Sequence, residues 1–161
     1  MRMSEGVEWA LHSCLNLAWA RDAGAVTVAR LAAYHELPTP YLNKQLQALS
    51  RAGIVSSVPG PRGGFRLARD PEDITLMDVV TAIEGPDQAF RCAEIRQQGP
   101  HGDVSSNSGR PCAVSHAMRQ AELAWRRELA ARTLADVMDD ARRSSPGLPE
   151  RVRRWFTPVR T

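Results

Sequence analysis

Hydrophobic residues recur at intervals of three and four between residues 28 and 52, the spacing of amphipathic helices. The apolar positions are Val28, Leu31, Ala32, Leu42, Leu46 and Leu49. Pro38 interrupts the pattern, because the residue before a proline is disfavoured in the α region. Thr39 suits the N-cap of a second helix with Pro40 at its first position, and Gly53 suits the left-handed residue that ends it. The pattern predicts two short helices joined by a tight connection, as in a helix-turn-helix.

A β-hairpin is predicted directly after these helices. Residues 54–55 and 65–67 are short β-like runs, and the proline- and glycine-rich residues 59–64 between them are typical of a turn. Residues 27–66 hold five basic side chains against the single acid Glu36. A local excess of positive charge is what the neutralisation of DNA phosphates requires. The segment therefore favours a nucleic-acid-binding winged helix over an ordinary packing unit with solvated charges.

The second helix and the hairpin tip carry the side chains that we expect to contact DNA. Polar side chains on the helix face opposite the leucines suit a recognition helix. In the hairpin tip, Arg62 suits a narrow minor groove, whose negative potential attracts an inserted arginine. The predicted DNA contacts are Thr39, Tyr41, Asn43, Lys44, Gln45, Arg62, Gly63 and Gly64.

Residues 4–20 are also predicted to form a helix, with an apolar stripe at helical spacing. Glu8 and His12 stand four positions apart, so their side chains lie one above the other on one face. The pair has two interpretations: a surface carboxylate–imidazole pair, or two ligands of one metal centre. Cys14 follows His12 by two positions, about 200° around an ideal helix, which favours a place in the core.

The chain after the hairpin begins with another predicted helix and continues into a long irregular segment. Thr75 and Asp78 form the capping pattern of that helix. Residues 86–111 then lack a periodic pattern, and a loop of this length is usually functional or disordered. Cys92 lies near its start and Cys112 just beyond its end. The spacing of the two cysteines alone leaves a metal site, a redox pair and two reduced bystanders open.

A long amphipathic helix is predicted over residues 113–141, where apolar residues recur every three or four positions for most of its length. Such a helix after a small DNA-binding domain favours a dimer interface, and a dimer matches the symmetry of palindromic operators. The alternative is a helix that folds back on its own domain. The remaining residues, 142–161, are basic, and the pattern assigns them no role.

Composition narrows the class of protein. The 161 residues suit one domain with an appended helical arm, and no apolar run approaches the roughly eighteen residues of a membrane span. We therefore expect a cytoplasmic protein without a membrane partner. Three cysteines, an odd number, argue against a disulfide framework in a reducing compartment. No separate general base or substrate-pocket signature accompanies Glu8 and His12, so we do not expect an enzyme.

These segments together resemble a known family. The runs PTPYLNKQLQALSRAGIV, GPRGGFRL and ITLMDVVTAIEG, with the cysteine-bearing loop and the long helix, are similar to the IscR/NsrR/RsrR group of Rrf-type bacterial transcription regulators. The similarity covers about residues 1–140. Pattern and resemblance agree on a mainly α fold with a small β-hairpin wing, a winged helix-turn-helix followed by a long C-terminal dimerisation helix. The resemblance also implies a homodimer on double-stranded promoter DNA.

The expected organisation has four parts. They are a DNA-binding domain over residues 1–85, a cluster-binding loop over 86–111, the dimerisation helix over 112–141 and a basic tail of unknown role over 142–161. Many members of the family hold an iron–sulfur cluster whose state sets DNA affinity. The resemblance therefore predicts an iron–sulfur cofactor.

The cysteine pattern departs from that of IscR- and NsrR-like members, which carry three closely spaced cysteines in this loop. RsrR-like members are instead similar to this chain, because they ligate a [2Fe–2S] cluster with Glu and His from one subunit and two Cys from the other. Carried over residue by residue, the resemblance implies the ligands Glu8, His12, Cys92 and Cys112. His116, one turn after Cys112, is the alternative imidazole.

The resemblance predicts a redox-responsive regulator, expected to repress, whose [2Fe–2S] state controls operator affinity. We expect a one-electron change to reposition the first helix against the recognition helix, with Trp9 either as the responsive packing element or as an ordinary core or interface tryptophan. Three alternatives remain. They are a cluster-free regulator that uses Cys92 and Cys112 as a thiol switch, a [2Fe–2S] electron carrier with incidental basic charge, and a zinc hydrolase.

Overall fold

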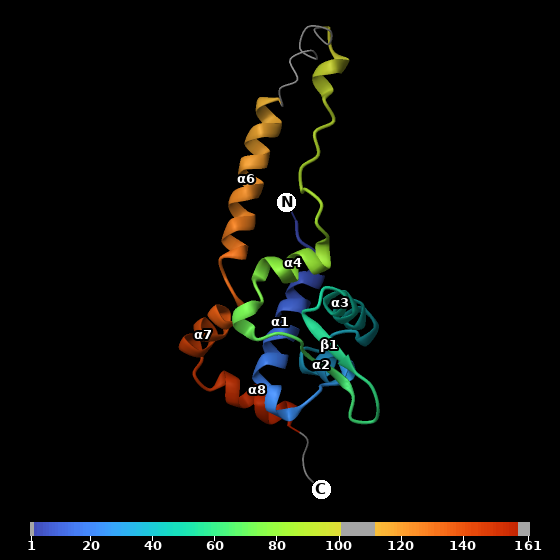
Figure 1. Ribbon diagram of the computed structural model, residues 1–161, viewed down its shortest axis with the longest axis vertical. Helices are drawn as coiled ribbons and strands as arrows, with labels where there is room; N and C mark the ends of the chain where they lie inside the picture. The colour runs from blue at the N-terminus through green and yellow to red at the C-terminus, as the bar shows by residue number, and fades with distance from the viewer. Residues whose placement is uncertain (1, 101–111, 158–161) are drawn as a thin grey trace. The chain divides into compact units, whose positions relative to one another are not determined.

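The computed structural model describes residues 2–100 and 112–157 (Figure 1). Residues 101–111 of the predicted cluster loop and 158–161 of the predicted tail lie outside the described residues. The chain divides into two compact units. They are the winged-helix unit, Arg2–Pro86 together with Leu129–Thr161, and the cysteine unit, Asp87–Glu128.

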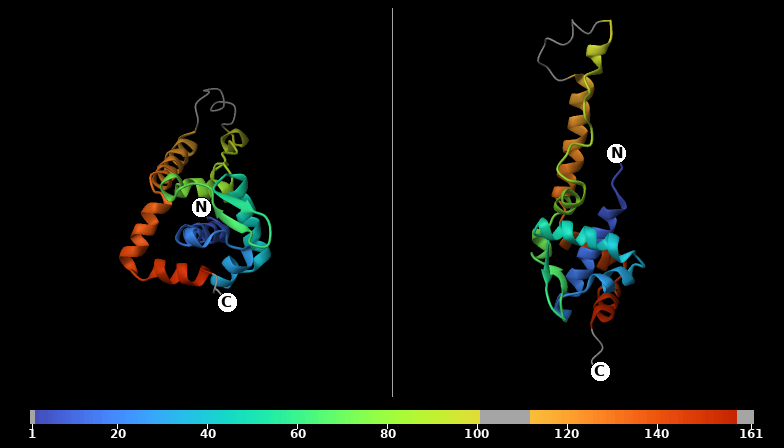
Figure 2. Two further views of the ribbon diagram at one scale, coloured as in Figure 1. Left: turned by 60° about the horizontal axis from the view of Figure 1, so that its bottom comes forward. Right: turned by 90° about the vertical axis from the view of Figure 1, so that its right-hand side faces the viewer.

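The winged-helix unit is built around α1, which covers Glu5–Trp19. Its other helices and strands are α2 (Val28–Tyr34), α3 (Thr39–Arg51), β1 (Val55–Val58), β2 (Gly64–Leu67), α4 (Leu76–Glu84), α7 (Leu134–Ser144) and α8 (Leu148–Phe156), with 3-10 turns at Arg21–Ala23 and Pro71–Asp73. In Figure 2, α1 lies inside a ring formed by these elements. Because α1 packs directly against α3, α4, β2, α7 and α8, it links α3 and the wing to the C-terminal helices.

The core of this unit consists of side chains from nearly every element. The largest fully buried ones include Leu31, Leu42, Leu46, Leu49, Ile54, Ile74, Leu134 and Val152. Burying such an aliphatic side chain is worth about 1.5–3 kcal/mol relative to leaving it in water. The predicted leucine face of the recognition helix is confirmed, and so is the core position of Cys14, which is 0% exposed.

β1 and β2 form the predicted hairpin as an antiparallel pair in which Val55 lies opposite Leu67. Phe65 extends the pairing through an isolated bridge to Val26, just before α2. Gly64 makes this close approach sterically accessible: a Cβ atom at that position would lie 2.3 Å from the Val26 carbonyl oxygen, and its φ is +142°. A side chain there would therefore separate the wing from α2.

Most helix ends follow the signals in the sequence. Thr75 and Asp78 form the predicted capping box of α4, and Gly53 takes a left-handed φ of 70° after α3. At the start of α3, Pro38 occupies the N-cap and Thr39 is already helical. The predicted boundary is therefore shifted by one residue, which leaves the recognition helix itself unchanged.

The single helix predicted over residues 113–141 is wrong. α6 covers Ala113–Ala130, and α7 begins separately after a capping box at Thr133. The break has a tertiary cause, because the backbone N–H of Leu134 donates to the carbonyl of Ile74 at 2.9 Å. This pairing replaces helical hydrogen bonds and places α7 in the winged-helix unit.

The C-terminal residues form α8, whose Val152 and Phe156 are buried. The guanidinium of Arg30 lies 5.3 Å from the centre of the Trp155 ring and donates to the Trp155 carbonyl. Arg30 belongs to the basic excess predicted to face DNA, but here it fastens α2 to α8. The described part of the tail thus has a structural role that its composition did not reveal.

The cysteine unit contains most of α6 and a segment that begins at Asp87 and includes the 3-10 turn Ile95–Gln98. The described part of this segment runs beside α6 (Figures 1 and 2). The Glu122 side chain is buried and accepts a hydrogen bond from the backbone N–H of Ala89 at 3.2 Å. Arg126 pairs with Glu122 at 2.9 Å and donates to the carbonyl of Asp87 at 2.9 Å. These bonds attach the start of the segment to α6.

No helix in the described part of the chain combines the length and the apolar character needed to cross a membrane.

Candidate DNA interface and cysteine site

The predicted recognition helix, α3, exposes most of its side chains that are predicted to contact DNA. Thr39, Tyr41 and Lys44 are exposed, Tyr41 by 64%, whereas Asn43 is half-buried. Arg62 is exposed in the turn between β1 and β2. A helix and a wing that present these polar and basic side chains have the chemistry needed to contact base edges and phosphates.

Gln45 differs from the other predicted contacts because it lies against α1. A Cβ atom added at Gly6 would lie 2.8 Å from Nε2 of Gln45, so the two helices meet where α1 has no side chain. Just before this point, the backbone N–H and the hydroxyl of Ser4 both donate to Oε1 of Glu84, at 2.8 and 2.6 Å. The beginning of α1 is therefore joined to the recognition helix and to the end of α4.

Trp9 lies at the same boundary. It is half-buried against the core, and with Tyr41, Lys44 and Gln45 it lines a hollow of about 540 Å³. A movement of α1 would reach the recognition helix through these contacts. The response of Trp9 to redox state stays a prediction.

The two wing glycines have a structural reason to be glycine. A Cβ atom at Gly63 would lie 2.2 Å from the carbonyl oxygen of Val58, and Gly64 abuts Val26 as described above. They are required for the wing to fold, whatever they contact. Their part in DNA binding stays a prediction.

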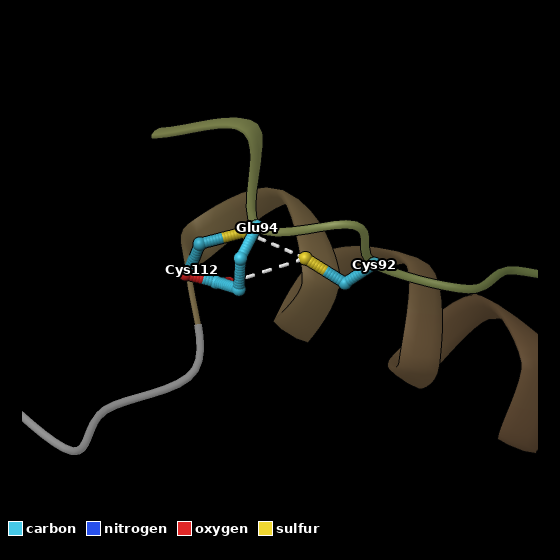
Figure 3. Close-up of side chains that lie close together, drawn as sticks. All are labelled: Cys92, Glu94 and Cys112. Carbon is cyan, nitrogen blue, oxygen red and sulfur yellow. Dashed lines mark hydrogen bonds between the residues drawn. The ribbon is translucent and has the colours of Figure 1, made fainter. Parts of the chain in front are cut away.

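Cys92 and Cys112 meet in the cysteine unit, together with Glu94 (Figure 3). Their Sγ atoms are 4.0 Å apart, and the Cys92 thiol donates to Oε1 of Glu94 at 3.2 Å. The three ligand atoms all lie within 4.8 Å of one another. Within residues 2–100 and 112–157, this is the one group of three or more His, Cys, Asp or Glu side chains with the spacing to hold a metal ion.

Each of the two sulfur atoms has a polar neighbour of the kind found around metal-ligating cysteines. Cys112 directly precedes α6, and the backbone N–H of Ser115 donates to its Sγ at 3.2 Å. At Cys92, the backbone hydrogen bond at Glu94 lowers the thiol pKa, but the Glu94 carboxylate, burial and Cys112 outweigh it and raise the pKa above its usual value. Two acidic neighbours beside one thiol favour a bound cation, which relieves their repulsion.

Sequence reasoning missed Glu94, because its position depends on an unusual backbone conformation. Its φ is +48°, a left-handed value that is uncommon for residues other than glycine, and this turn places its side chain beside Cys92. Arg96 donates to Oε2 of Glu94 at 2.7 Å, which leaves Oε1 facing the thiol. The hydrogen bonds from Arg96 and then from Cys92 lower the pKa of the Glu94 carboxyl.

Glu8 and His12 are both exposed and lie one turn apart on α1, as predicted. Together they help to line a hollow of about 470 Å³. Behind them, the ring of His35 lies 5.4 Å from that of His12, and its Nε2 is 2.8 Å from Nδ2 of Asn16. Burial and, to a lesser degree, His12 lower the pKa of His35 against the opposing effect of Glu8.

The four predicted cluster ligands are thus divided equally between the units, with Glu8 and His12 in one and Cys92 and Cys112 in the other. The alternative imidazole, His116, is exposed on the first turn of α6 and is not a member of the donor group around Cys92. Ligation of a cluster by the four residues stays a prediction.

A mainly apolar cavity of about 540 Å³ adjoins the two sulfur atoms. It is lined by Phe90, Arg91, Cys92, Ala93, Glu94, Ile95, Arg96, Cys112, Ala113 and Val114. Phe90, Ile95 and Val114 give the cavity its apolar walls beside the two thiols.

The sequence matches one family model over most of its length. A model described as Rrf2, an iron-dependent transcriptional regulator, matches residues 3–140. The chain belongs to the Rrf2 family. A relative from Aquifex aeolicus, named as an HTH-type transcriptional regulator, is 37% identical over 116 residues, which are 72% of this chain and 76% of that protein. The prediction of a transcriptional regulator is therefore confirmed at the level of the family. Membership in a family of transcriptional regulators implies that the protein binds DNA.

Two solved structures share the fold of this Rrf2-family chain. T. potens IscR matches with a TM-score of 0.68 at 23% identity, over 90% of this chain and 91% of that one. CymR, the global cysteine regulator of B. subtilis, also matches with a TM-score of 0.68 at 23% identity, over 86% of this chain and 97% of that one. The predicted class, mainly helical with a two-stranded wing, is confirmed.

Proposed function

We propose that this Rrf2-family transcriptional regulator senses redox state through a [2Fe–2S] cluster held by Cys92, Cys112, Glu8 and His12. The observation that carries the proposal is the 4.0 Å separation of the Cys92 and Cys112 sulfur atoms. Two thiolates on one tetrahedral metal, each about 2.3 Å from it, are about 3.8 Å apart. The cysteine pair therefore has nearly the spacing of two ligands on a single iron.

The other iron would be held by Glu8 and His12, which offer an oxygen and a nitrogen donor one helical turn apart. A cluster with four protein ligands needs both pairs. When bound, such a centre exchanges one electron, and imidazole in place of thiolate raises its reduction potential, as in Rieske centres. The donor set present in the chain fits this group.

A second copy of the chain is the proposed partner. α6 exposes Val114, Met118 and Leu123, by 64, 43 and 39%, although apolar side chains at helical spacing normally pack against another surface. In a homodimer, Glu8 and His12 of one subunit would join Cys92 and Cys112 of the other. This arrangement supplies four ligands from two incomplete pairs, and it matches the two-fold symmetry of a pseudo-palindromic operator.

The chain's own contacts give a route from the ligands to DNA. Glu8 stands two residues after Gly6, where α1 abuts Gln45 of the recognition helix. A change in the position of α1 would therefore displace Gln45, which lies among the predicted DNA contacts. α3 would read the major groove while Arg62 of the wing enters the adjacent minor groove. Expected as a repressor, the dimer would bind its promoter in one redox state more strongly than in the other.

A thiol switch is the second candidate function, and the same cysteine pair favours it. Attack of one thiolate on a peroxide forms a sulfenic acid and releases an alcohol or water; the second thiol then displaces water to form a disulfide. The Sγ atoms need to approach from 4.0 Å to about 2.05 Å. CymR, one of the structures that share the fold, is described as the global cysteine regulator of B. subtilis, and the S. aureus CymR has been solved in an oxidised form.

The deciding experiment is a visible absorption and EPR spectrum of the full chain purified without oxygen, for the parent, His12→Ala and Cys92→Ser. A reduced [2Fe–2S] signal that is altered by His12→Ala and lost in Cys92→Ser supports the proposal. A cluster unaffected by His12→Ala overturns the ligand set. A colourless preparation that forms a reversible disulfide would overturn the cluster proposal and support the thiol switch instead.

The coupling route has its own test. Gly6→Ala should push the end of the Gln45 side chain aside, which changes operator affinity by several-fold while the free energy of unfolding shifts by less than about 1 kcal/mol. Fluorescence anisotropy on a promoter fragment selected from genomic DNA measures the affinity in both redox states. Gly99→Ala is the matched control, because a Cβ atom there meets nothing within 4 Å. Equal affinities for the parent and both variants would rule out the Gly6–Gln45 contact as the route.

A further inference from the structure

We propose that Cys92, Glu94 and Cys112 of a single chain also form a site for one thiophilic divalent cation, of which Zn²⁺ is the best chemical match. The inference rests on the cysteine pair used in the proposed function, but it does not require Glu8, His12 or a cluster. It assigns Glu94 a role as a metal ligand.

The spacing of the donor atoms fits a mononuclear site. A tetrahedral cation with Zn–S distances of about 2.3 Å and a Zn–O distance of about 2.0 Å places two sulfurs about 3.8 Å apart and a sulfur and an oxygen about 3.5 Å apart. The observed distances are 4.0 Å between the Sγ atoms and 3.2 Å from Cys92 Sγ to Oε1 of Glu94. Figure 3 shows the Cys92 sulfur facing both Cys112 and Glu94. Small side-chain rotations would complete the site, and a water molecule would supply the fourth donor.

The backbone around Glu94 supports the assignment. Its left-handed φ of +48° is a conformation that side chains adopt at a cost of order 1 kcal/mol or more, and such conformations gather at functional sites. In an extended strand, residues two apart also share a side, but their Cβ atoms lie about 6.6 Å apart. The turn at Glu94 instead brings its carboxylate within hydrogen-bond distance of the Cys92 sulfur.

The charges around the donors are balanced for a divalent cation. Two thiolates and one carboxylate carry three negative charges, so a divalent cation leaves a net charge of −1. Arg96, bound to Oε2 of Glu94 at 2.7 Å, offsets that remainder. It also holds the carboxylate so that its other oxygen faces the sulfurs, and Ser115 donates to Cys112 at 3.2 Å. Outer hydrogen bonds of this kind orient metal ligands and tune their affinity.

The donor types select the metal. Two thiolates with one carboxylate suit borderline and soft cations, whereas Mg²⁺ and Ca²⁺ require an oxygen set. Because both states need the same two thiolates, one bound Zn²⁺ and a [2Fe–2S] cluster exclude each other. A chain loaded with Zn²⁺ would therefore hold its cysteines without engaging Glu8 and His12, and it would not respond to one-electron reduction.

Co²⁺ is the probe, since a tetrahedral Co²⁺ site with thiolate ligands absorbs strongly in the visible and near-ultraviolet range. Metal-free full-length protein is titrated with Co²⁺ under anaerobic conditions, and Zn²⁺ is then added to displace it. We expect one Co²⁺ per chain, thiolate charge-transfer absorption, and displacement by one Zn²⁺. Glu94→Gln should weaken Co²⁺ binding at least about tenfold. Cys92→Ser removes one of the two Co–S bonds, so it should reduce the charge-transfer absorption at saturation to about half or less and weaken binding further.

The controls separate this site from the cluster site. Glu128→Gln, a substitution at an exposed glutamate of the same unit, should leave Co²⁺ affinity at the parent value, and circular dichroism confirms that each variant is folded. His12→Ala should also retain Co²⁺ affinity while it alters the cluster spectrum. Unchanged Co²⁺ affinity in Glu94→Gln, or an equal loss in His12→Ala, would overturn the inference. If His12→Ala changed neither Co²⁺ binding nor the spectrum of the cluster, the proposed cluster ligands would be wrong, and the inference would still stand.

Discussion

The two units of this chain treat the same residue types in opposite ways. In the winged-helix unit Cys14 is 0% exposed, and burial raises the pKa of its thiol to about 12, so it serves as a small apolar core residue. In the cysteine unit Cys92 is exposed beside Cys112 and Glu94. The environment, not the residue type, decides whether a thiol packs or reacts.

The two units also differ in how they bury apolar and charged side chains. The winged-helix unit buries Leu42, Leu46 and Leu49 of α3 in its core, whereas α6 leaves Val114 and Met118 exposed. Conversely, the buried carboxylate of Glu122 in the cysteine unit is satisfied by Arg126 and by a backbone N–H. One unit is therefore stabilised by its own core, and the other by polar attachments and, as proposed, by a second copy of the chain.

Alkylation should show the largest difference between the two cysteine environments. At about pH 8 a thiol with a pKa near 12 has about one part in ten thousand as thiolate, and burial blocks access as well. Metal-free native protein should therefore incorporate iodoacetamide at Cys92 on the order of a thousandfold faster than at Cys14. Because its pKa is raised, the Cys92 rate should keep increasing with pH beyond the range of an ordinary thiol. Peptide mass spectrometry measures both rates, and labelling of native Cys14 at a comparable rate would contradict the comparison.

Core truncation should have the next largest effect. Leu46→Ala removes a fully buried side chain and should lower the free energy of unfolding by about 2–5 kcal/mol. Val114→Ala, at an exposed position of α6, should change the stability of a subunit by less than about 0.5 kcal/mol but weaken self-association. Chemical denaturation and sedimentation equilibrium give the two quantities. Similar losses of stability in both variants would mean that α6 is part of a single core.

Loss of the buried carboxylate of Glu122 should have a smaller and more local effect on stability. Glu122→Gln weakens the bond to Arg126 and should lower stability by about 1–3 kcal/mol, with faster amide exchange at Ala89. Glu128→Gln, an exposed change on the same helix, should do neither. Hydrogen exchange followed by mass spectrometry tests whether the attachment of residues 87–89 to α6 depends on Glu122. Unchanged protection of the Ala89 amide in Glu122→Gln would show that it does not.

The smallest effect concerns pH. The folded state lowers the pKa of His35, so below its unfolded value, about 6.5, the unfolded chain binds more protons and stability falls as the pH falls. The loss of stability increases as the pH falls to the pKa of His35 in the folded state, and below that pH it stays constant. His35→Gln should flatten stability against pH in that window, whereas His116→Gln, on an exposed residue, should not. An unchanged slope in His35→Gln would assign the dependence to other groups.

Local signals were sufficient for much of the fold. The spans of α1, α3 and α4 followed from apolar spacing, prolines and capping residues, because these act within one or two helical turns. The wing followed from its glycines and the two short β-like runs. Family membership likewise followed from contiguous motifs. The pairing of Cys92 with Cys112 was an expectation from the resemblance, and the structure places their sulfur atoms together.

Tertiary contacts decided the remainder. The helix predicted over 113–141 breaks because Leu134 pairs with Ile74, sixty residues earlier in the chain, and Arg30 is engaged by Trp155, 125 residues away. Glu94 joins the cysteines through a left-handed turn that no periodic pattern encodes. The sequence by itself determined α1, α3, α4 and the wing, since these depend on neighbouring residues. Only the folded chain decided which distant groups meet, because long-range pairing depends on how whole elements pack.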